Sequence, residues 1–310
     1  MTIYTRVHLK NFLVPLILPL LILLSGGCHR DAPPGAKRVK ALITADGMQH
    51  TLFVVMNHNL SRVTSGSPGE AHAANWLADT FSHYGLRPGG SRQTFFVEYP
   101  LPDNNEHQFA RNVVGQTPGM RVINGGILLT TVYNRLDTDE SQSDSEAVKA
   151  SAARVALLLE IANATAGRPG DTPIYFSARS ERSIPEAKDV SVVLNLQNSP
   201  AGFGNDTLHI AADSIPSQWK PFLGNLSDSL VHVDFDYHGL SSSVSPNVKI
   251  NILIPTKAWT HAADNKQRQK GLNELAHSAQ IIRKLLYRIA MLQPEISTPG
   301  DSTQFAPHPG

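Results

Sequence analysis

The densest group of metal-binding residue types lies in one alternating segment, where His232, Asp234, Asp236 and His238 are each separated by one apolar residue. Successive side chains of a β-strand point to opposite faces, so all four would share one face. Imidazole and carboxylate groups are zinc ligands. However, residues two apart along a strand lie about 6.5–7 Å apart, which is long for neighbours that share one ion. A solvated face opposite an apolar one explains the pattern more simply, and we keep a metal site as the alternative.

Other catalytic patterns are missing from the sequence. There is no Gly-x-Ser-x-Gly nucleophile turn, and neither of the Gly-rich phosphate-binding patterns occurs. None of the 13 His residues pairs recognisably with a Ser and an Asp. The 27 Lys and Arg balance the 26 Asp and Glu, whereas a nucleic-acid partner would call for a basic surface. We therefore expect no nucleic-acid partner.

A strand, a polar loop and a helix run from Gly126 to Ala164, and the rest of the chain is organised around them. The strand is an apolar run rich in β-branched residues that follows two glycines. Ser143 and Glu146 have capping-box spacing at the start of the helix, which we expect to close near Gly167. α/β folds place their chemistry in such a passage, outside the carboxyl ends of the strands.

This passage resembles the core of the zinc aminopeptidases of metallopeptidase family twenty-eight, the bacterial leucyl aminopeptidase and transferrin-receptor type. In that family the strand ends in His-x-Asp, and the next helix opens with Asp-Asn-Ala-Ser-Gly before a Leu-Leu-Glu-Leu-Ala run. The chain carries Leu-Leu-Glu-Ile-Ala at residues 158–162. Val132-Tyr133-Asn134 stands where His-x-Asp belongs, and residues 150–154 replace Asp-Asn-Ala-Ser-Gly.

Two further segments support the resemblance, which extends over about residues 60–290. Ser67 is a candidate N-cap, Pro68 takes the first helical position and Glu70 closes a capping box, with Gly85 ending the helix. Together with Leu86-Arg-Pro this segment is similar to the family's amino-terminal signature. Residues 111–115, Arg-Asn-Val-Val-Gly, are similar to a strand and turn of the family with the pattern Asn-Val-x-Gly.

The expected fold is α/β, a single three-layer sandwich in which helices flank a mixed, mostly parallel twisted sheet, as in zinc exopeptidases. Apolar runs and alternation predict further strands over 95–99, 173–178, 190–197, 207–211, 230–238 and 248–255. Helical spacing predicts helices over 41–56 and 272–292.

The family's chemistry implies two zinc ions bridged by an Asp and a water, with a Glu that shuttles the proton. By the resemblance the first His ligand falls on Val132 and the bridging Asp on Ala150, and neither side chain binds metal. An Asp ligand falls on Gln197, a neutral amide. The residual candidates are Glu181, at the Glu-Glu pair, and His261, at the last His.

The sequence therefore predicts no catalytic residues, no metal ligands beyond those two candidates and no cofactor. Zinc is expected only under the alternative that His261, Glu181 and the His232–His238 face form a rearranged ligand set. The simpler interpretation of His261 is a residue that caps the last helix or forms a hydrogen bond near it. The simpler interpretation of Glu181 is a surface ion pair with the neighbouring arginines.

The amino-terminal segment reads as a targeting sequence. Residues 1–28 have a basic start, a short apolar run broken by prolines, and Ser-Gly-Gly before Cys28, which is typical of a signal peptide with a lipobox-like end. We expect lipidation of Cys28, a tether over 29–40, an aminopeptidase-like domain over 41–293 and a disordered tail over 294–310. The lipid would anchor the protein in the bacterial cell envelope, facing the periplasm.

These observations favour an envelope lipoprotein whose aminopeptidase-like domain has lost its di-zinc site and binds a peptide or protein partner. Transferrin receptor and nicastrin, which belong to the family that the chain resembles, carry this fold without peptidase chemistry. The first alternative is an active zinc metallopeptidase with a rearranged ligand set. The second is a purely structural component of the envelope.

Overall fold

The computed structural model describes residues 42–58, 60, 63–101, 109–118, 125–134, 144–167, 170–180, 190–198, 208–211, 231–234 and 248–292. The chain divides into two compact units, Met1–Lys37 and Arg38–Gly310, and all described residues belong to the second. The predicted signal segment, the tether and the tail lie outside the described residues. No helix in the described ranges is long and apolar enough to cross a bilayer.

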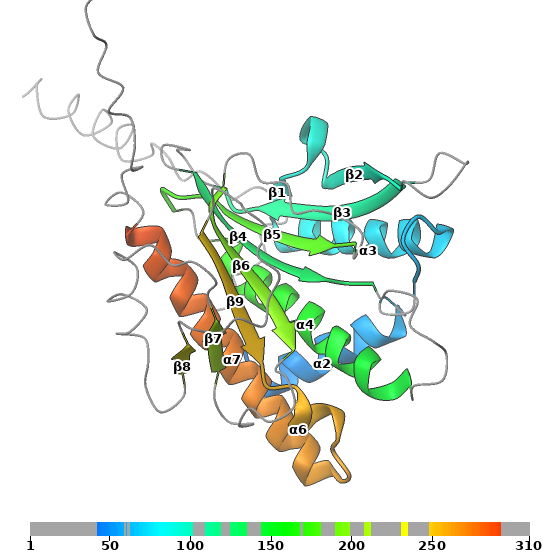
Figure 1. Cartoon of the computed structure of the whole chain (residues 1–310), viewed down its shortest axis with the longest axis vertical. Helices are drawn as coiled ribbons and strands as arrows, with labels where there is room; N and C mark the ends of the chain where they lie inside the picture. The colour runs from blue at the N-terminus through cyan, green and yellow to red at the C-terminus, as the bar shows by residue number, and fades with distance from the viewer. Residues whose placement is uncertain are drawn as a thin grey trace, which may run out of the picture. The chain divides into compact units, whose positions relative to one another are not determined.

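The described residues of the second unit form a nine-stranded mixed sheet with the order β1-β3-β5-β4-β6-β9-β7-β8, and β2 pairs with β3 (Figure 1). The strands are β1 Arg87–Pro88, β2 Phe96–Pro100, β3 Phe109–Gln116, β4 Gly126–Val132, β5 Ile174–Arg179, β6 Val190–Asn198, β7 Leu208–Ala211, β8 Val231–Asp234 and β9 Val248–Ile254. The central strands β5, β4, β6 and β9 are mutually parallel, whereas β3 and β7 join them antiparallel. The predicted mixed sheet with flanking helices is confirmed.

The described helices are α2 Ala45–Asn57, α3 Pro68–Tyr84, α4 Asp144–Thr165, α6 Lys257–Thr260 and α7 Asn265–Leu292, with a 3-10 turn, η3, over Ser91–Gln93. The predicted ends of α3 are confirmed. Ser67 Oγ accepts a hydrogen bond from the Glu70 amide at 3.1 Å, and Gly85 ends the helix with a φ of 87°, a left-handed conformation that suits glycine.

Two helices begin elsewhere than predicted. α2 begins at Ala45 rather than residue 41, because Thr44 Oγ1 caps the Gly47 amide at 3.1 Å. α7 begins at Asn265 rather than residue 272, and Asp264 Oδ1 accepts from the Gln267 amide at 2.7 Å. The first turn of α7 is exposed and polar, so it carries no apolar periodicity that would reveal it in the sequence.

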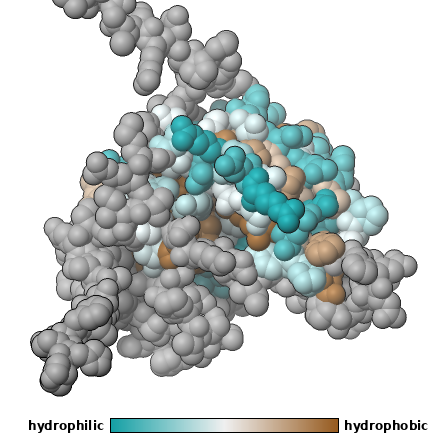
Figure 2. Space-filling model, turned by 90° about the horizontal axis from the view of Figure 1, so that it is seen from above, coloured by the Kyte–Doolittle hydropathy of each residue, from teal (hydrophilic) through white to brown (hydrophobic). Residues whose placement is uncertain are grey.

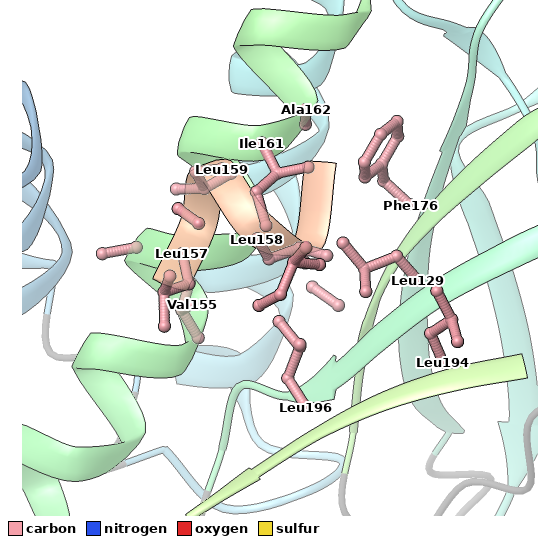
Figure 3. Packing of buried hydrophobic residues seen from close by; sticks show 14 of the residues in the cluster. Leu129, Val155, Leu157, Leu158, Leu159, Ile161, Ala162, Phe176, Leu194 and Leu196 are labelled. Atoms are coloured by element: carbon pink, nitrogen blue, oxygen red, sulfur yellow. The ribbon is translucent and has the colours of Figure 1, made fainter. Parts of the chain in front are cut away.

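Helix α4 forms the centre of the hydrophobic core. Its residues Leu157 and Leu158 are fully buried, and the helix packs on the sheet face that presents Leu129, Phe176 and Leu194 (Figure 3). α2 and α7 pack against α4 as well, so α4 is covered on several sides. Burial of each Leu side chain contributes about 1.5–3 kcal/mol, and the core therefore fixes α4 firmly relative to the ends of the strands.

The described residues on the other face of the central sheet form a much smaller apolar cluster than those facing α4. This smaller cluster consists of Leu128, Val190 and Val193, with Tyr175 packed against it. Figure 2 shows hydrophilic and apolar residues interspersed over the coloured surface seen from above Figure 1.

Candidate functional site at the carboxyl ends of the central strands

The carboxyl ends of β4, β5 and β6 meet at one edge of the sheet because the three strands are parallel. The position that the resemblance equates with the first His ligand is Val132, the last residue of β4 and half-buried. The position equated with the bridging Asp is Ala150, which is only 7% exposed on α4. Neither side chain has a donor atom for a metal.

Helix α4 begins at Asp144, well before Ala150, where by the resemblance the family's helix opens. The predicted N-cap, Ser143, lies outside the described residues, so this capping stays a prediction. The additional turns carry Lys149, whose Nζ donates to the carbonyl oxygen of Thr260 at 3.3 Å. The start of α4 is therefore tied to the end of α6.

His261, the retained candidate ligand, lies in the turn between α6 and α7. Its Nε2 is 2.9 Å from Oε1 of Glu146, and the two side chains are 47% and 52% exposed. Its Nδ1 is 2.8 Å from the Thr260 hydroxyl. A carboxylate only accepts hydrogen bonds, so Nε2 is the donor to Glu146. Both ring nitrogens thus have protein partners.

Gln197, at the position of an Asp ligand, belongs to a cluster of amides on β6 and β9. Its Nε2 donates to Asn251 Oδ1 at 3.2 Å, and Asn195 Nδ2 donates to the same oxygen at 3.1 Å. Asn195 and Asn251 are cross-strand partners. Gln197 therefore completes a polar ladder between neighbouring strands.

A cationic side chain stands next to the end of β4. Arg179, the last residue of β5, pairs with Val132 in the parallel register. Burial lowers the pKa of Arg179, and the neighbouring Tyr99 opposes that shift. An arginine remains charged at any ordinary pH, so the edge carries a guanidinium beside the position of the first His ligand.

The other predicted ligands are not brought together by described residues. Glu181, Asp236 and His238 lie outside the described residues. The predicted strand over 230–238 is described only as β8, in which the backbone of His232 pairs with that of His209. Within the described ranges, no three His, Cys, Asp or Glu side chains form a group that could hold a metal ion. The rearranged ligand set with His261 and Glu181 stays the alternative, because Glu181 lies outside the described residues.

A buried polar network beneath this edge was not predicted. Asn134 is 2% exposed and Glu70 is 1% exposed. The Asn134 amide nitrogen lies 3.1 Å from Glu70 Oε1, 3.0 Å from Ser65 Oγ and 3.1 Å from Ser180 Oγ, and the two hydroxyls lie 2.7 Å apart. The amide thereby gives the buried carboxylate a charge-assisted hydrogen bond.

Of the two hydrogen bonds of the predicted capping box, only the one accepted by the Ser67 side chain forms. Ser67 caps the Glu70 amide, but the Glu70 carboxylate accepts from the Gly66 amide and from Asn134 instead of from the Ser67 amide. The Ser67 amide donates to the Thr64 carbonyl. The buried Asn134 side chain attracts the carboxylate inward, a tertiary contact that a local motif does not contain.

The network continues along the sheet. The Ser180 amide donates to Asn112 Oδ1 at 2.9 Å, and the Tyr133 hydroxyl donates to the Arg111 carbonyl at 3.0 Å. Burial, and then the charge and hydrogen bonding of Glu70, raise the pKa of Tyr133 far above its ordinary value. The phenol therefore stays neutral, and the network positions β3, β4, β5 and α3 against one another.

Solved structures with a similar fold include zinc aminopeptidases and glutaminyl cyclases. A zinc aminopeptidase from Bacillus subtilis is 10% identical, with 81% of this chain and 96% of that chain covered and a TM-score of 0.53. The glutaminyl cyclase of an Acidobacteriales bacterium is 17% identical over 86% and 100% of the two chains, with a TM-score of 0.50. An aminopeptidase from Aneurinibacillus sp. strain AM-1 is 12% identical over 81% and 95%, with a TM-score of 0.50.

No protein-family model matches the sequence. No curated protein matches it either. Likeness at such low identity concerns the arrangement of the backbone, and fold alone does not give function. The chain has the fold shared by zinc aminopeptidases and glutaminyl cyclases, with the mixed sheet and flanking helices predicted from its sequence.

Proposed function

We propose that this protein is a lipid-anchored envelope protein that uses an aminopeptidase-like fold, without a di-zinc site, to bind a peptide or protein partner. The observation that carries the proposal is the arrangement around His261. Its two ring nitrogens contact Glu146 and Thr260, and Lys149 binds the Thr260 carbonyl. Contacts within the chain thus occupy both ring nitrogens of the retained candidate ligand.

The charges at this edge of the sheet also disfavour a metal. Zinc sites use thiolate, imidazole and carboxylate donors. Here an ammonium group, that of Lys149, lies beside the α6–α7 turn, and the Arg179 guanidinium lies beside Val132. Like charges repel most strongly where water is excluded, so each of these cations opposes the approach of a divalent ion.

The same edge offers groups that suit a peptide. The side-chain amides of Asn195, Gln197 and Asn251 contain donors and acceptors, the chemistry of peptide groups themselves. Arg179 adds a fork of donors that matches a carboxylate. A peptide that carries an acidic side chain or a free carboxyl terminus fits this combination.

The alternative function, an active zinc metallopeptidase, has one observation in its favour. His261 Nε2 and Glu146 Oε1 lie 2.9 Å apart, and imidazole with carboxylate is a ligand pair that zinc uses. Under this alternative the remaining ligands would come from Glu181 and from the His232–His238 segment.

Zinc stoichiometry separates the two functions. The full chain is purified in detergent without a chelator or a His-tag, loaded with zinc, desalted and analysed for metal. We expect almost no bound zinc and no hydrolysis of aminoacyl p-nitroanilides. One or two equivalents of zinc, lost in His261→Ala, would overturn the proposal and establish the metallopeptidase.

Peptide binding needs its own test. Random peptides displayed on phage are selected on the full chain, and the selected sequences are synthesised. We expect Arg179→Gln to weaken their binding about tenfold, the loss of about 1.4 kcal/mol. Asp171→Asn, an exposed change on another loop, serves as the control and should leave the affinity unchanged. Peptides that bind Arg179→Gln as tightly as the wild-type protein would contradict this site.

A further inference from the structure

A separate cavity lies among helices α2, α3 and α4, in the helical layer. Its volume is about 500 Å³, within the range of small-molecule sites. Each helix contributes residues spaced by three or four, which is the spacing of one helix face. The lining residues are Gly47, His50, Thr51 and Val54 of α2, Trp76, Asp79, Thr80, His83 and Tyr84 of α3, and Leu159, Glu160 and Asn163 of α4.

A buried carboxylate belongs to the lining of this cavity. Glu160 is 2% exposed, and its Oε1 accepts a hydrogen bond of 2.6 Å from the Thr51 hydroxyl. The two residues are 109 positions apart in the chain, so the contact fixes α2 to α4. A carboxylate accepts up to about four hydrogen bonds, so it can receive donors in addition to Thr51.

Trp76 and Tyr84 contribute large aromatic side chains to the lining. The indole of Trp76 is stacked with the imidazole of His58, with ring centroids 4.3 Å apart and an angle of 26° between the planes. This stacking covers one face of the indole and holds the ring in place. Burial, followed by His72, lowers the pKa of His58, which disfavours the charged form of the stacked imidazole. Tyr84, which is half-buried, supplies the second ring.

The charged residues of the lining favour a positively charged ligand. Among the described lining residues Glu160 and Asp79 are acids, and none is Lys or Arg. An aromatic face attracts a cation by about 0.5–2 kcal/mol, most strongly when the ring is Trp. Carboxylates and aromatic rings together are the groups that bind an organic ammonium ion. A metal ion would need several converging ligands, and within the described ranges no three His, Cys, Asp or Glu side chains form such a group.

We propose that the cavity between α2, α3 and α4 binds a small organic ammonium ion, with Glu160 and Asp79 balancing its charge and Trp76 and Tyr84 packing against it. The cavity is formed by helices, whereas the peptide site of the proposed function lies at the carboxyl ends of the strands. This ligand site is therefore independent of that function, and either can fail without the other.

The experiment is isothermal titration calorimetry of the full chain in detergent at pH 8, where ordinary imidazoles are neutral. The probes are choline, n-butylammonium and 3,3-dimethylbutan-1-ol, which has the shape of choline without its charge. We expect at least one cation to bind at a single site, and the neutral alcohol to bind at least about tenfold more weakly. The proposal would be overturned if the neutral alcohol bound as tightly as the cations. It would also be overturned if neither cation bound with a dissociation constant below about 10 mM.

Three variants locate the binding. Asp79→Asn changes an exposed residue at the cavity and should weaken cation binding about threefold, while Glu160→Gln should weaken it at least about tenfold. Asp171→Asn makes the same chemical change at an exposed position outside the lining and should have no effect. Because Asp79 is exposed, its variant tests the site even if Glu160→Gln does not fold. Cation binding that Asp79→Asn leaves unchanged would place the site elsewhere.

Discussion

Nε2 of His261 lies 2.9 Å from Oε1 of Glu146, which joins the α6–α7 turn to the first turns of α4. The pair stands where the resemblance places the last metal ligand. Its two side chains are about half exposed, so water screens their attraction. The contact therefore orients the turn more than it stabilises the fold.

We expect His261→Gln to lower the free energy of unfolding by less than about 1 kcal/mol, because exposed ion pairs contribute little. Urea unfolding of the single variants His261→Gln and Glu146→Gln and of the double variant gives the coupling energy directly. A loss above about 2 kcal/mol would show that the pair is shielded from water and has a larger structural role.

Asn134→Ala should be much more harmful. It removes the amide that donates to Glu70 and leaves a buried carboxylate with one partner fewer, which costs about 3 kcal/mol or more. Urea unfolding measures the loss. Asn273→Ala, an exposed change on α7, is the matched control and should stay within about 0.5 kcal/mol of wild type. Equal effects of the two changes would refute the role assigned to the network.

The raised pKa of Tyr84 predicts that the free energy of unfolding falls at alkaline pH. Burial, and then Glu160, raise the pKa of Tyr84 to about 12 from 10.0. Below pH 10 both states keep the proton and the full stability is present; between pH 10 and about 12 only the unfolded chain releases it. The free energy of unfolding should fall there by about 1.4 kcal/mol per pH unit from this group.

The measurement is urea unfolding at pH 9, 10 and 11 for wild type and Tyr84→Phe. Above pH 10 the free energy of unfolding of Tyr84→Phe should fall less steeply with pH, because the variant has no phenol proton to release at this position. Below pH 10 it should change with pH as steeply as that of the wild type. Identical slopes above pH 10 would mean that Tyr84 titrates normally in the folded protein. Tyr133, which is shifted in the same direction, remains in both proteins and cancels in the comparison.

Gly126→Ala tests the start of β4. A Cβ added at Gly126 would clash with Cε2 of Tyr175 and would lie 3.0 Å from the carbonyl oxygen of Pro173. Because a backbone atom cannot move aside easily, we expect a loss of about 1–3 kcal/mol in thermal or urea unfolding. Gly170→Ala, whose nearest contact would be at 3.6 Å, should change stability little. A neutral Gly126→Ala would contradict the packing of Tyr175 over β4.

Cys28→Ser tests the predicted lipid anchor. If Cys28 is lipidated, the serine variant should remain unprocessed and should not incorporate labelled fatty acid. Membrane fractionation and metabolic labelling of the two proteins in bacterial cells measure these outcomes. Unchanged processing and labelling in Cys28→Ser would end the lipoprotein hypothesis, whatever the function of the folded domain.

Local signals in the sequence predicted most elements of the fold. The apolar run at 126–132 and the capping residue Ser67 correspond to β4 and to the start of α3, because strand burial and helix capping depend on residues close together in the chain. The start of α7 was missed, since its exposed first turn has no apolar pattern. The two-residue strand β1 was missed as well, since it exists only through its pairing with β3.

The sequence by itself determined which side chains stand at the presumed ligand positions, because Val132 and Ala150 lack donor atoms in any conformation. Only the tertiary structure decided the partners. Glu70 meets Asn134 across 64 residues, and Thr51 meets Glu160 across 109. Such contacts arise when packed helices and strands exclude water and each buried polar group must find a donor or an acceptor, a condition that no local pattern of residues contains.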